Sequence, residues 1–321
     1  RTPDRQAVWD RTRSVSYAEF EETVAGLAAR ICECRGDLGA CGVLPIVTGR
    51  DVGSVVAINA AIRAGVAFAP IDAGSAPAVV TALLARLDSP RLAVVAEPGF
   101  ADVLPARTRA IGERDPGLGV VDPQPVDPAA LSRVMFTSGS SGEPKGVMLD
   151  WRSIDAFADD PLVAVPPGFA DYRALNVAPF SFGAGVVMAI RPALGTALSI
   201  VDPNVHEPAE LFEIYDRERI NAVVVVASHV TSALDRWPTG RRLEHASSVS
   251  VFGEPMEWPM VAVLRRVAAA DAVVANVYGA TESGGVVLAL RIDATMPTAT
   301  GRVPLGRPLG PDLVRLDPIS D

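Results

Sequence analysis

Apolar residues recur along the chain in two patterns that alternate. Between positions 17 and 31 they return every three or four residues, which predicts a helix with one buried face, and Ser16 with Glu19 forms a capping box at its start. Elsewhere they form short continuous runs, such as 44–48 and 222–227, which predict buried strands. Strand and helix patterns follow one another for most of the sequence. That order is typical of an α/β fold with mostly parallel sheets.

The expected elements cover most of the chain. Helices are predicted over residues 17–31, 52–64, 77–87, 153–158, 184–193, 208–219, 229–236 and 256–269. Strands are predicted over residues 44–48, 66–72, 92–96, 133–136, 175–178, 222–227, 249–252 and 273–278. The segment 97–130 is rich in Pro, Gly, Asp and Arg and has weak periodicity, so we expect an irregular connection there.

These elements group into an expected domain organisation. We predict two mostly parallel sheets with helices on both faces, in a layered αβαβα arrangement. The first α/β half would cover residues 1–130 and the second 131–285. From 286 to 321 the helical pattern stops, and short apolar runs between Gly and Pro turns indicate the start of a small β-barrel-like unit.

Composition narrows the class of partner. The 321 residues are 49% hydrophobic and carry a net charge of −9, which suits a soluble globular chain and argues against nucleic acid as the main partner. No apolar run approaches the roughly 20 residues of a membrane helix, and the first residues show no signal peptide. The three cysteines are an odd number, which argues against a disulfide framework. Three such ligands without a fourth nearby make only a weak case for a zinc site. We expect a cytoplasmic protein without a membrane or nucleic-acid partner.

A polar loop stands between two apolar runs at residues 137–146. It reads Thr-Ser-Gly-Ser-Ser-Gly-Glu-Pro-Lys-Gly. Glycines allow backbone N–H groups to turn toward one point, hydroxyls add donors and the lysine adds charge, so this composition suits a phosphate. An ordinary surface turn explains the same residue types equally well. A Walker loop is excluded, because Gly146 stands where that motif requires Ser or Thr after the lysine.

A second polar segment follows a predicted strand at 276–282 and reads Asn-Val-Tyr-Gly-Ala-Thr-Glu. Tyr278 could stack on a planar base, Thr281 could donate to a phosphate, and Glu282 could hold Mg²⁺, a hard ion that prefers oxygen. A strand-end turn with an exposed acid is the alternative interpretation. The segment 251–255 also follows a strand, and there a turn into a helix is an equally good interpretation.

Together these segments resemble the adenylate-forming enzymes, a superfamily that includes the adenylation domains of nonribosomal peptide synthetases and the acyl-CoA ligases. The loop 137–146 matches the signature S/T-S-G-S/T-S/T-G-x-P-K-G, and 276–282 contains the Y-G-x-T-E motif in the expected order. The segment 251–255 resembles G-G/A-E, with Phe252 where the family often has a small residue. Further segments that resemble the family are 15–20, 63–72 and 303–308. The resemblance covers essentially the whole chain.

The resemblance implies chemistry that uses ATP and Mg²⁺. A carboxylic acid would be activated as an acyl-adenylate with release of pyrophosphate, and the acyl group would pass to a carrier-protein phosphopantetheine or to coenzyme A. Lys145, Thr281 and Glu282 would be catalytic, with Glu282 holding the metal and Thr281 contacting the α-phosphate. Tyr278 would stack on adenine. The expected nucleotide-binding set is Thr137, Ser138, Gly139, Ser140, Ser141, Gly142, Lys145, Gly253, Glu254, Tyr278 and Thr281.

The segment 179–185 resembles the stretch before the family's substrate-pocket helix, which commonly reads F-D-x-S in peptide synthetases. Gly183 stands where that aspartate would pair with the α-ammonium of an amino acid, and a buried ammonium without a countercharge is costly. We therefore expect a substrate without an ordinary α-ammonium, that is, an acyl, hydroxy, keto or β-amino acid. The expected pocket is lined by Phe182, Gly183, Ala184, Val187, Val224, Ser250, Phe252 and Val277.

The resemblance also implies parts that this sequence does not contain. A T-G-D segment, a hinge and a small mobile C-terminal domain with a catalytic lysine would follow residue 321, so we expect this chain alone to bind nucleotide weakly and to adenylate poorly. A non-catalytic adenylation-like scaffold or binding module is the alternative function. A kinase is disfavoured by the failed Walker pattern. Trp151 is one departure, since the family often has a histidine there.

Overall fold

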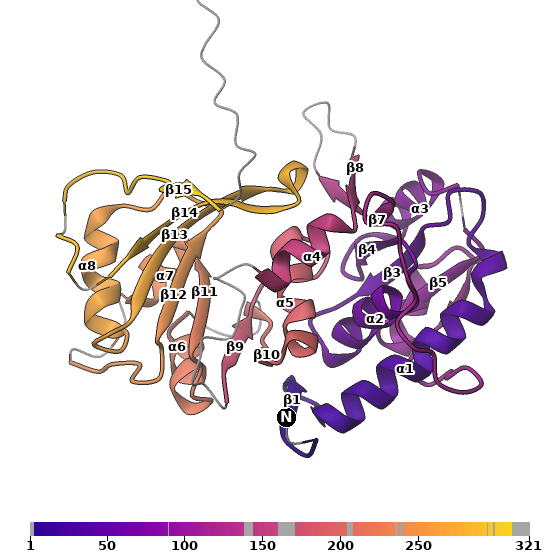
Figure 1. Cartoon of the computed structure of the whole chain (residues 1–321), viewed down its shortest axis with the longest axis horizontal. Helices are drawn as coiled ribbons and strands as arrows, with labels where there is room; N and C mark the ends of the chain where they lie inside the picture. Colours follow the sequence, from indigo (N-terminus) through magenta and orange to yellow (C-terminus); the bar gives the residue numbers. More distant parts are fainter. Residues whose placement is uncertain are drawn as a thin grey trace, which may run out of the picture. The chain divides into compact units, whose positions relative to one another are not determined.

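The chain folds into two compact units, each with its own helices and strands (Figure 1). The units are Arg1–His206 and Glu207–Asp321. Both units combine helices with strands, and most neighbouring strands in the described part of the chain are parallel, so the predicted α/β fold with mostly parallel sheets is confirmed. The domain limits expected near residues 130 and 285 stay a prediction. The computed structural model describes residues 3–88, 90–137, 144–159, 171–203, 208–234, 237, 240–293, 295–297 and 299–309.

The first unit contains a six-stranded sheet in the order β6-β5-β3-β4-β7-β8. Its strands are β3 (Leu44–Thr48), β4 (Phe68–Asp72), β5 (Leu92–Val95), β6 (Arg109–Ile111), β7 (Leu131–Thr137) and β8 (Lys145–Asp150). Neighbouring strands are parallel except β8, which runs antiparallel to β7 and forms a hairpin with it. Every residue of β3 is buried, as its continuous apolar run predicts for a central parallel strand.

Three helices accompany this sheet, and local sequence signals explain where two of them begin. They are α1 (Tyr17–Glu33), α2 (Val52–Arg63) and α3 (Pro77–Ala85). The predicted capping box precedes α1: the Glu19 N–H donates to Ser16 Oγ (3.2 Å), and the Ser16 N–H donates to the Glu19 carboxylate (2.7 Å). Before α2, the Asp51 carboxylate accepts from the Ser54 N–H (2.7 Å). Helices α1 and α2 then pack against each other (Figure 1).

The first unit also holds a second group of strands, in the order β9-β10-β1-β2. The strands are β1 (Gln6–Trp9), β2 (Ser14–Ser16), β9 (Arg173–Asn176) and β10 (Ala197–Ile200), and the helices are α4 (Arg152–Asp159) and α5 (Gly183–Leu194). Strands β9, β10 and β1 are parallel, and β2 is antiparallel to β1. The buried Asn59 of α2 donates to the Ala189 carbonyl of α5 (2.8 Å). That bond ties α5, which carries predicted pocket residues, to the helices of the first sheet.

The second unit is built on strands in the order β15-β14-β13-β12-β11. They are β11 (Ala222–Val226), β12 (Ser248–Phe252), β13 (Val273–Ala280), β14 (Gly285–Ile292) and β15 (Arg307–Pro308). Strands β11, β12 and β13 are parallel, whereas β14 and β15 each run antiparallel to the strand before them. The helices are α6 (Pro208–Arg217), α7 (Ala227–Leu234) and α8 (Trp258–Val267). The carboxyl ends of β11, β12 and β13 therefore lie at one edge, where α/β folds bind ligands.

Several strands are missing from the sequence prediction. Strand β6 lies inside the segment 97–130, which was expected to be irregular, yet it pairs in parallel with β5. Three residues are too few to produce a periodic signal. Strand β14 runs along β13 from Ala280 back to Val274, so residues 285–292 continue the sheet of the second unit. The other strands not predicted are β1, β2, β8, β10 and β15.

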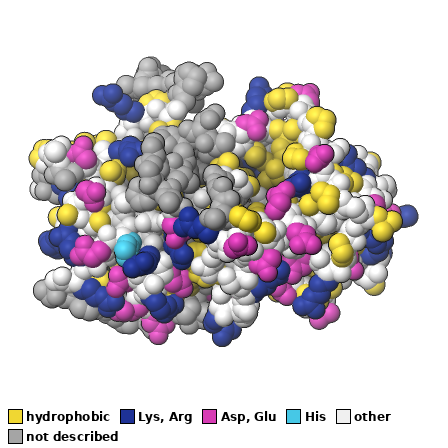
Figure 2. Space-filling view, turned by 60° about the horizontal axis from the view of Figure 1, so that its bottom comes forward, with side chains coloured by type: hydrophobic (Ala, Val, Ile, Leu, Met, Phe, Trp, Pro, Cys, Tyr) yellow, Lys and Arg dark blue, Asp and Glu magenta, His cyan; other side chains and the backbone are white. Residues whose placement is uncertain are grey.

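The surface mixes charges of both signs. Figure 2 shows acidic and basic side chains interspersed over the described part of one face. A surface that binds the phosphate backbone of a nucleic acid would instead show clustered cations. In the ranges that the structure describes, no helix is both long enough and apolar enough to cross a bilayer.

Candidate active site

The β7–β8 hairpin holds both ends of the predicted phosphate loop. Thr137 ends β7 and lies opposite Lys145, which begins β8. Thr137 is half-buried and Lys145 is exposed. The hairpin therefore fixes the two ends of the loop side by side, with a cationic side chain where the loop re-enters the sheet. Outside the described residues lie Ser138, Gly139, Ser140, Ser141 and Gly142.

A buried arginine connects this hairpin to α4. Arg133 on β7 is 1% exposed, and its guanidinium donates to Ser153 Oγ (2.8 Å). Burial lowers the pKa of Arg133 to about 10, and the nearby Asp150 carboxylate opposes that shift. Trp151 lies at the same corner, is 5% exposed, and donates its backbone N–H to the Ala130 carbonyl (3.2 Å). Trp151, which stands where the family often has a histidine, is therefore buried between the end of β8 and the start of α4 in this chain.

Four predicted pocket residues lie at the start of α5. Phe182 immediately precedes the helix and is 61% exposed. Gly183 and Ala184 open the first turn and are half-buried. Val187 is half-buried three residues after Ala184, so the two side chains share one side of the helix. The structure thus presents this predicted group together on one short segment.

The two glycines at this helix start differ in what surrounds them. A Cβ added to Gly183 would meet no atom within 4 Å. A Cβ added to Gly185 would approach the Pro179 carbonyl oxygen to 2.1 Å, which no side chain tolerates. Packing therefore requires glycine at 185 but leaves space for a side chain at 183.

The remaining pocket residues share one face of three neighbouring strands in the second unit. Val224 on β11 lies opposite Ser250 on β12, and Ser250 lies opposite Ala275 on β13. Register partners, and residues two apart along a strand, point to the same face of a sheet. Phe252 and Val277 therefore join Val224 and Ser250 on this face. Val224 and Phe252 are half-buried there, so the face is not filled by the unit's own core.

The end of β13 and the short turn that follows it carry the three residues of the second motif, with Tyr278 on the strand and Thr281 and Glu282 in the turn. Tyr278 is 47% exposed, Thr281 is half-buried and Glu282 is exposed. Ser283 fixes the turn: its Oγ accepts from the Ala280 N–H (3.0 Å), and its hydroxyl lies 2.7 Å from the Ala280 carbonyl oxygen, to which it donates. One short segment therefore carries an aromatic ring, a hydroxyl and a carboxylate, of which the ring and the carboxylate are exposed.

The segment after β12 forms a turn, and an acidic residue of this turn binds the start of a helix. Gly253 has φ +78°, a conformation that favours glycine. Next to it, the Glu254 carboxylate accepts two hydrogen bonds from Ser228, one from its backbone N–H (2.7 Å) and one from its hydroxyl (3.0 Å). Ser228 is in the first turn of α7. The Glu254 carboxylate therefore binds at the start of α7, which precedes β12, and not at the start of α8, the helix that follows the turn.

Three residues at these places were missed by sequence reasoning. Val226 lies opposite Phe252 and two residues from Val224, so period-two alternation along β11 could have found it. Ser283 directly follows the Thr-Glu pair, and serine often closes such turns. Ser228 carries no local signal, because it is 26 residues from the carboxylate that it binds.

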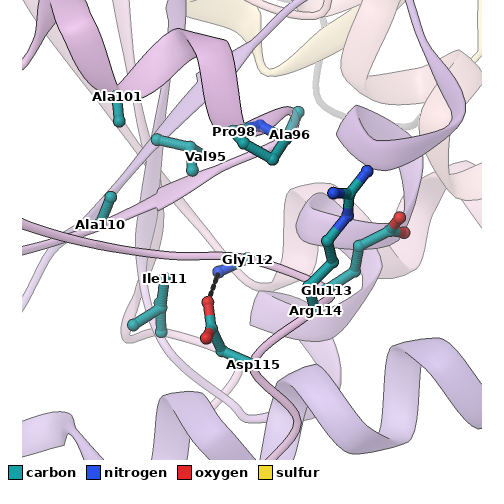
Figure 3. Close-up of a pocket in the computed structure, with 10 residues that line it drawn as sticks. All are labelled: Val95, Ala96, Pro98, Ala101, Ala110, Ile111, Gly112, Glu113, Arg114 and Asp115. Atoms are coloured by element: carbon teal, nitrogen blue, oxygen red, sulfur yellow. Dashed lines mark hydrogen bonds between the residues drawn. The ribbon is translucent and has the colours of Figure 1, made fainter.

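The first unit also contains a small cavity at the ends of β5 and β6 (Figure 3). Its volume is about 200 Å³. Across its mouth the Gly112 N–H donates to the Asp115 carboxylate (3.2 Å), and Glu113 is ion-paired with Arg13. Its lining residues are Val95, Ala96, Pro98, Ala101, Ala110, Ile111, Gly112, Glu113, Arg114 and Asp115. None of these lining residues belongs to the predicted site.

Comparison with known proteins agrees with the motifs and the fold. A model of the family described as "AMP-binding enzyme" matches residues 1–316. Identity is 26% over 327 residues to cyclosporin synthetase of Tolypocladium inflatum and 26% over 319 residues to bacitracin synthase 1 of Bacillus licheniformis. These matches cover 95% and 96% of this chain but only 2% and 6% of the relatives, so the chain spans a small part of their length.

A solved structure has the same fold. It is the crystal structure of the nonribosomal peptide synthetase FmoA3 in an AMPPNP-bound form, with a TM-score of 0.80 at 22% identity. The match covers 96% of this chain and 33% of that one.

Proposed function

Because the chain belongs to the AMP-binding enzyme family, we propose that it activates a carboxylic acid with ATP. A carboxylate oxygen attacks the α-phosphorus, the bond from that phosphorus to the β-phosphate oxygen breaks, and the products are an acyl-adenylate and pyrophosphate. This reaction brings two anions together and needs no covalent intermediate on the protein. Alignment and charge stabilisation are therefore what the protein must supply.

The turn at the end of β13 is the observation that carries the proposal. It presents Tyr278, Thr281 and Glu282 within one short segment, with Tyr278 and Glu282 exposed. An exposed ring suits stacking on adenine, and a hydroxyl suits a hydrogen bond to the α-phosphate. The Glu282 carboxylate is the hard oxygen donor that Mg²⁺ prefers, and the bound ion would neutralise charge on the phosphates. A strand-end turn without a ligand would need none of these groups exposed together.

The glycine-rich loop has a separate role in the proposal. Thr137 and Lys145 lie opposite each other where the loop begins and ends, and in the proposal the loop binds the β- and γ-phosphates. Lys145 adds charge as the pyrophosphate leaves. The backbone at Gly253 would lie beside the adenine ring. The AMPPNP bound to the solved structure of similar fold supports ATP as the nucleotide.

The substrate acid is the finer part of the proposal. Gly183 offers no countercharge, and the strand face of Val224, Ser250, Phe252 and Val277 is apolar apart from one hydroxyl. Such a surface suits an acyl, hydroxy or keto acid rather than an ordinary α-amino acid, and a β-amino acid would require that another residue supply the countercharge. The relatives are peptide synthetases, so we propose a carrier-protein phosphopantetheine thiol as the acceptor, with coenzyme A as the alternative.

Acid-dependent exchange between ATP and labelled pyrophosphate tests the proposal. The intact protein would be assayed with a panel of amino, hydroxy, keto, aryl and fatty acids, with the products identified. We expect label in ATP only when a suitable acid is present. Exchange without any dependence on acid, or formation of ADP as a kinase would give, contradicts the proposal. If the protein catalyses neither reaction with any acid, the result would favour the non-catalytic scaffold.

A further inference from the structure

Glu254 makes two hydrogen bonds that connect the turn after β12 to the start of α7, beyond the last paired residues of β11 and β12. Strand β11 leads directly into α7, and Ser228 lies in the first turn of that helix. Strand β12 ends at Phe252, and Glu254 follows after one glycine. The carboxylate binds the Ser228 N–H at 2.7 Å and its hydroxyl at 3.0 Å. One side chain therefore spans from the end of one strand to the helix that follows its neighbour.

These contacts are stronger than an average surface contact. An anion near the start of a helix is stabilised by the unpaired N–H groups there. Hydrogen bonds to a charged acceptor are also roughly twice as strong as neutral ones. Gly253, with φ +78°, lets the chain turn tightly enough for Glu254 to reach back. Both oxygens of the carboxylate thus accept a hydrogen bond from the first turn of α7.

The residues on either side of the contact belong to the proposed site. Val226 and Phe252 are register partners at the ends of the two strands, on the face that carries Val224 and Ser250. Gly253 is the backbone proposed to lie beside adenine. The contact therefore holds the turn with Gly253 directly beside the end of the acid-binding face.

We propose that Glu254 is a positioning residue, which acts through Ser228 to hold the turn after β12, with Gly253, in the position that ATP and the acid require. This inference rests on the proposed function. It assigns the Glu254 side chain to the protein's own helix rather than to the nucleotide or the metal. Loss of the contact should loosen binding of both substrates and leave the chemical step nearly unchanged.

A double-mutant cycle tests the assignment with two readouts, AMPPNP affinity by calorimetry and KM against kcat in the exchange assay. We expect Glu254→Ala to weaken AMPPNP binding and raise both KM values about tenfold, with kcat within about twofold, since charged hydrogen bonds are worth that much. Ser228→Ala should have a smaller effect, because its backbone N–H remains. Adding it to Glu254→Ala should weaken binding no further. Glu254→Gln, whose amide oxygen still accepts, should restore part of the affinity.

Glu257→Ala is the matched control. Glu257 is also exposed and precedes α8, but its side chain makes no hydrogen bond to that helix. The same charge is removed, and we expect affinity and KM to stay at the wild-type values.

Two results would overturn the assignment. If the effects of Glu254→Ala and Ser228→Ala on affinity multiply, the carboxylate does not act through Ser228. If Glu254→Ala leaves affinity and KM unchanged, the contact does not position the site. A wild-type protein that binds no AMPPNP would refute the proposed function and the positioning role with it. Non-additive melting temperatures of the same variants would still register the contact in that case, so the two failures are distinguishable.

Discussion

Gly183 is the residue that we expect to influence most which acid the site accepts. Its neighbour Gly185 is required by packing, but a side chain at 183 would meet no atom within 4 Å. The absence of a carboxylate there is therefore not forced by the fold. Because nothing in the packing demands glycine, we interpret the residue as part of the specificity for an acid that lacks an α-ammonium.

Gly183→Asp should change that specificity. The new carboxylate would stand at the start of α5, where a helix N-terminus favours negative charge, so folding should not suffer. It would also supply the countercharge that an α-ammonium needs. We expect exchange with α-amino acids to rise by about tenfold or more in kcat/KM, or ~1.4 kcal/mol. The measurement is the exchange assay with an α-amino acid and its α-hydroxy analogue.

Gly183→Asn is the control for shape. It fills the same space without charge, so it should not raise activity with α-amino acids. An equal gain from the asparagine variant, or no gain from the aspartate, would show that position 183 does not face the α-carbon substituent.

At the level of single residues, a local motif can name a candidate residue but cannot show which residue its side chain binds. Tyr278, Thr281 and Glu282 follow one another closely, so a local motif identifies them. The bond between Glu254 and Ser228 joins residues 26 apart, and only the pairing of β11 with β12 brings them together. A local pattern could not tell whether Glu254 serves the ligand or the helix.

At the scale of elements, prediction succeeded where the local signal was complete. Helix α1 has a capping box and one apolar face, and strand β3 is a continuous apolar run between turns. Strand β6 has three residues, and β1 pairs with β10 far along the chain, so neither carries a signal in its own sequence. Strands of this kind form because a neighbour offers unpaired backbone groups, which is a property of the sheet.

The start of α2 offers a test of element stability. Burial raises the pKa of Asp51 to about 6 from its ordinary 3.8, opposed by its bonds to Ser54, while Glu97 and Asp10 raise it further. The folded state therefore binds the proton more tightly than the unfolded state. The stabilisation from this group is complete below the unfolded pKa and is lost as pH rises through about 6.

Asp51→Asn should remove that loss. Asparagine still accepts from the Ser54 N–H but cannot ionise, so the variant should be more stable than the wild type at about pH 8, by up to ~3 kcal/mol. The difference should shrink toward pH 4. Urea unfolding of both proteins across this range is the measurement. Glu22→Gln, at an exposed position on α1, is the control and should not alter the pH profile. If the stability of the variant changes with pH in the same way as that of the wild type, the result would contradict a raised pKa of Asp51.

At the scale of the whole molecule, the residues predicted for the site are divided between the two compact units. The first unit supplies the two ends of the glycine-rich loop and the start of α5, and the second supplies the β13 turn and the strand face. The family could be inferred from sequence because several motifs occur in order along the entire chain. The division at His206 and Glu207 could not, since no change in composition marks it.

Oxygen-18 transfer from the carboxylate to AMP tests the central claim most directly. The intact protein would be given ATP, an accepted acid labelled in both carboxylate oxygens, and hydroxylamine to intercept the activated acyl group at its carbonyl carbon. If a carboxylate oxygen attacks the α-phosphorus, the AMP released will carry one oxygen-18 atom, and pyrophosphate will carry none. Unlabelled AMP, or ADP in its place, would contradict the formation of an acyl-adenylate.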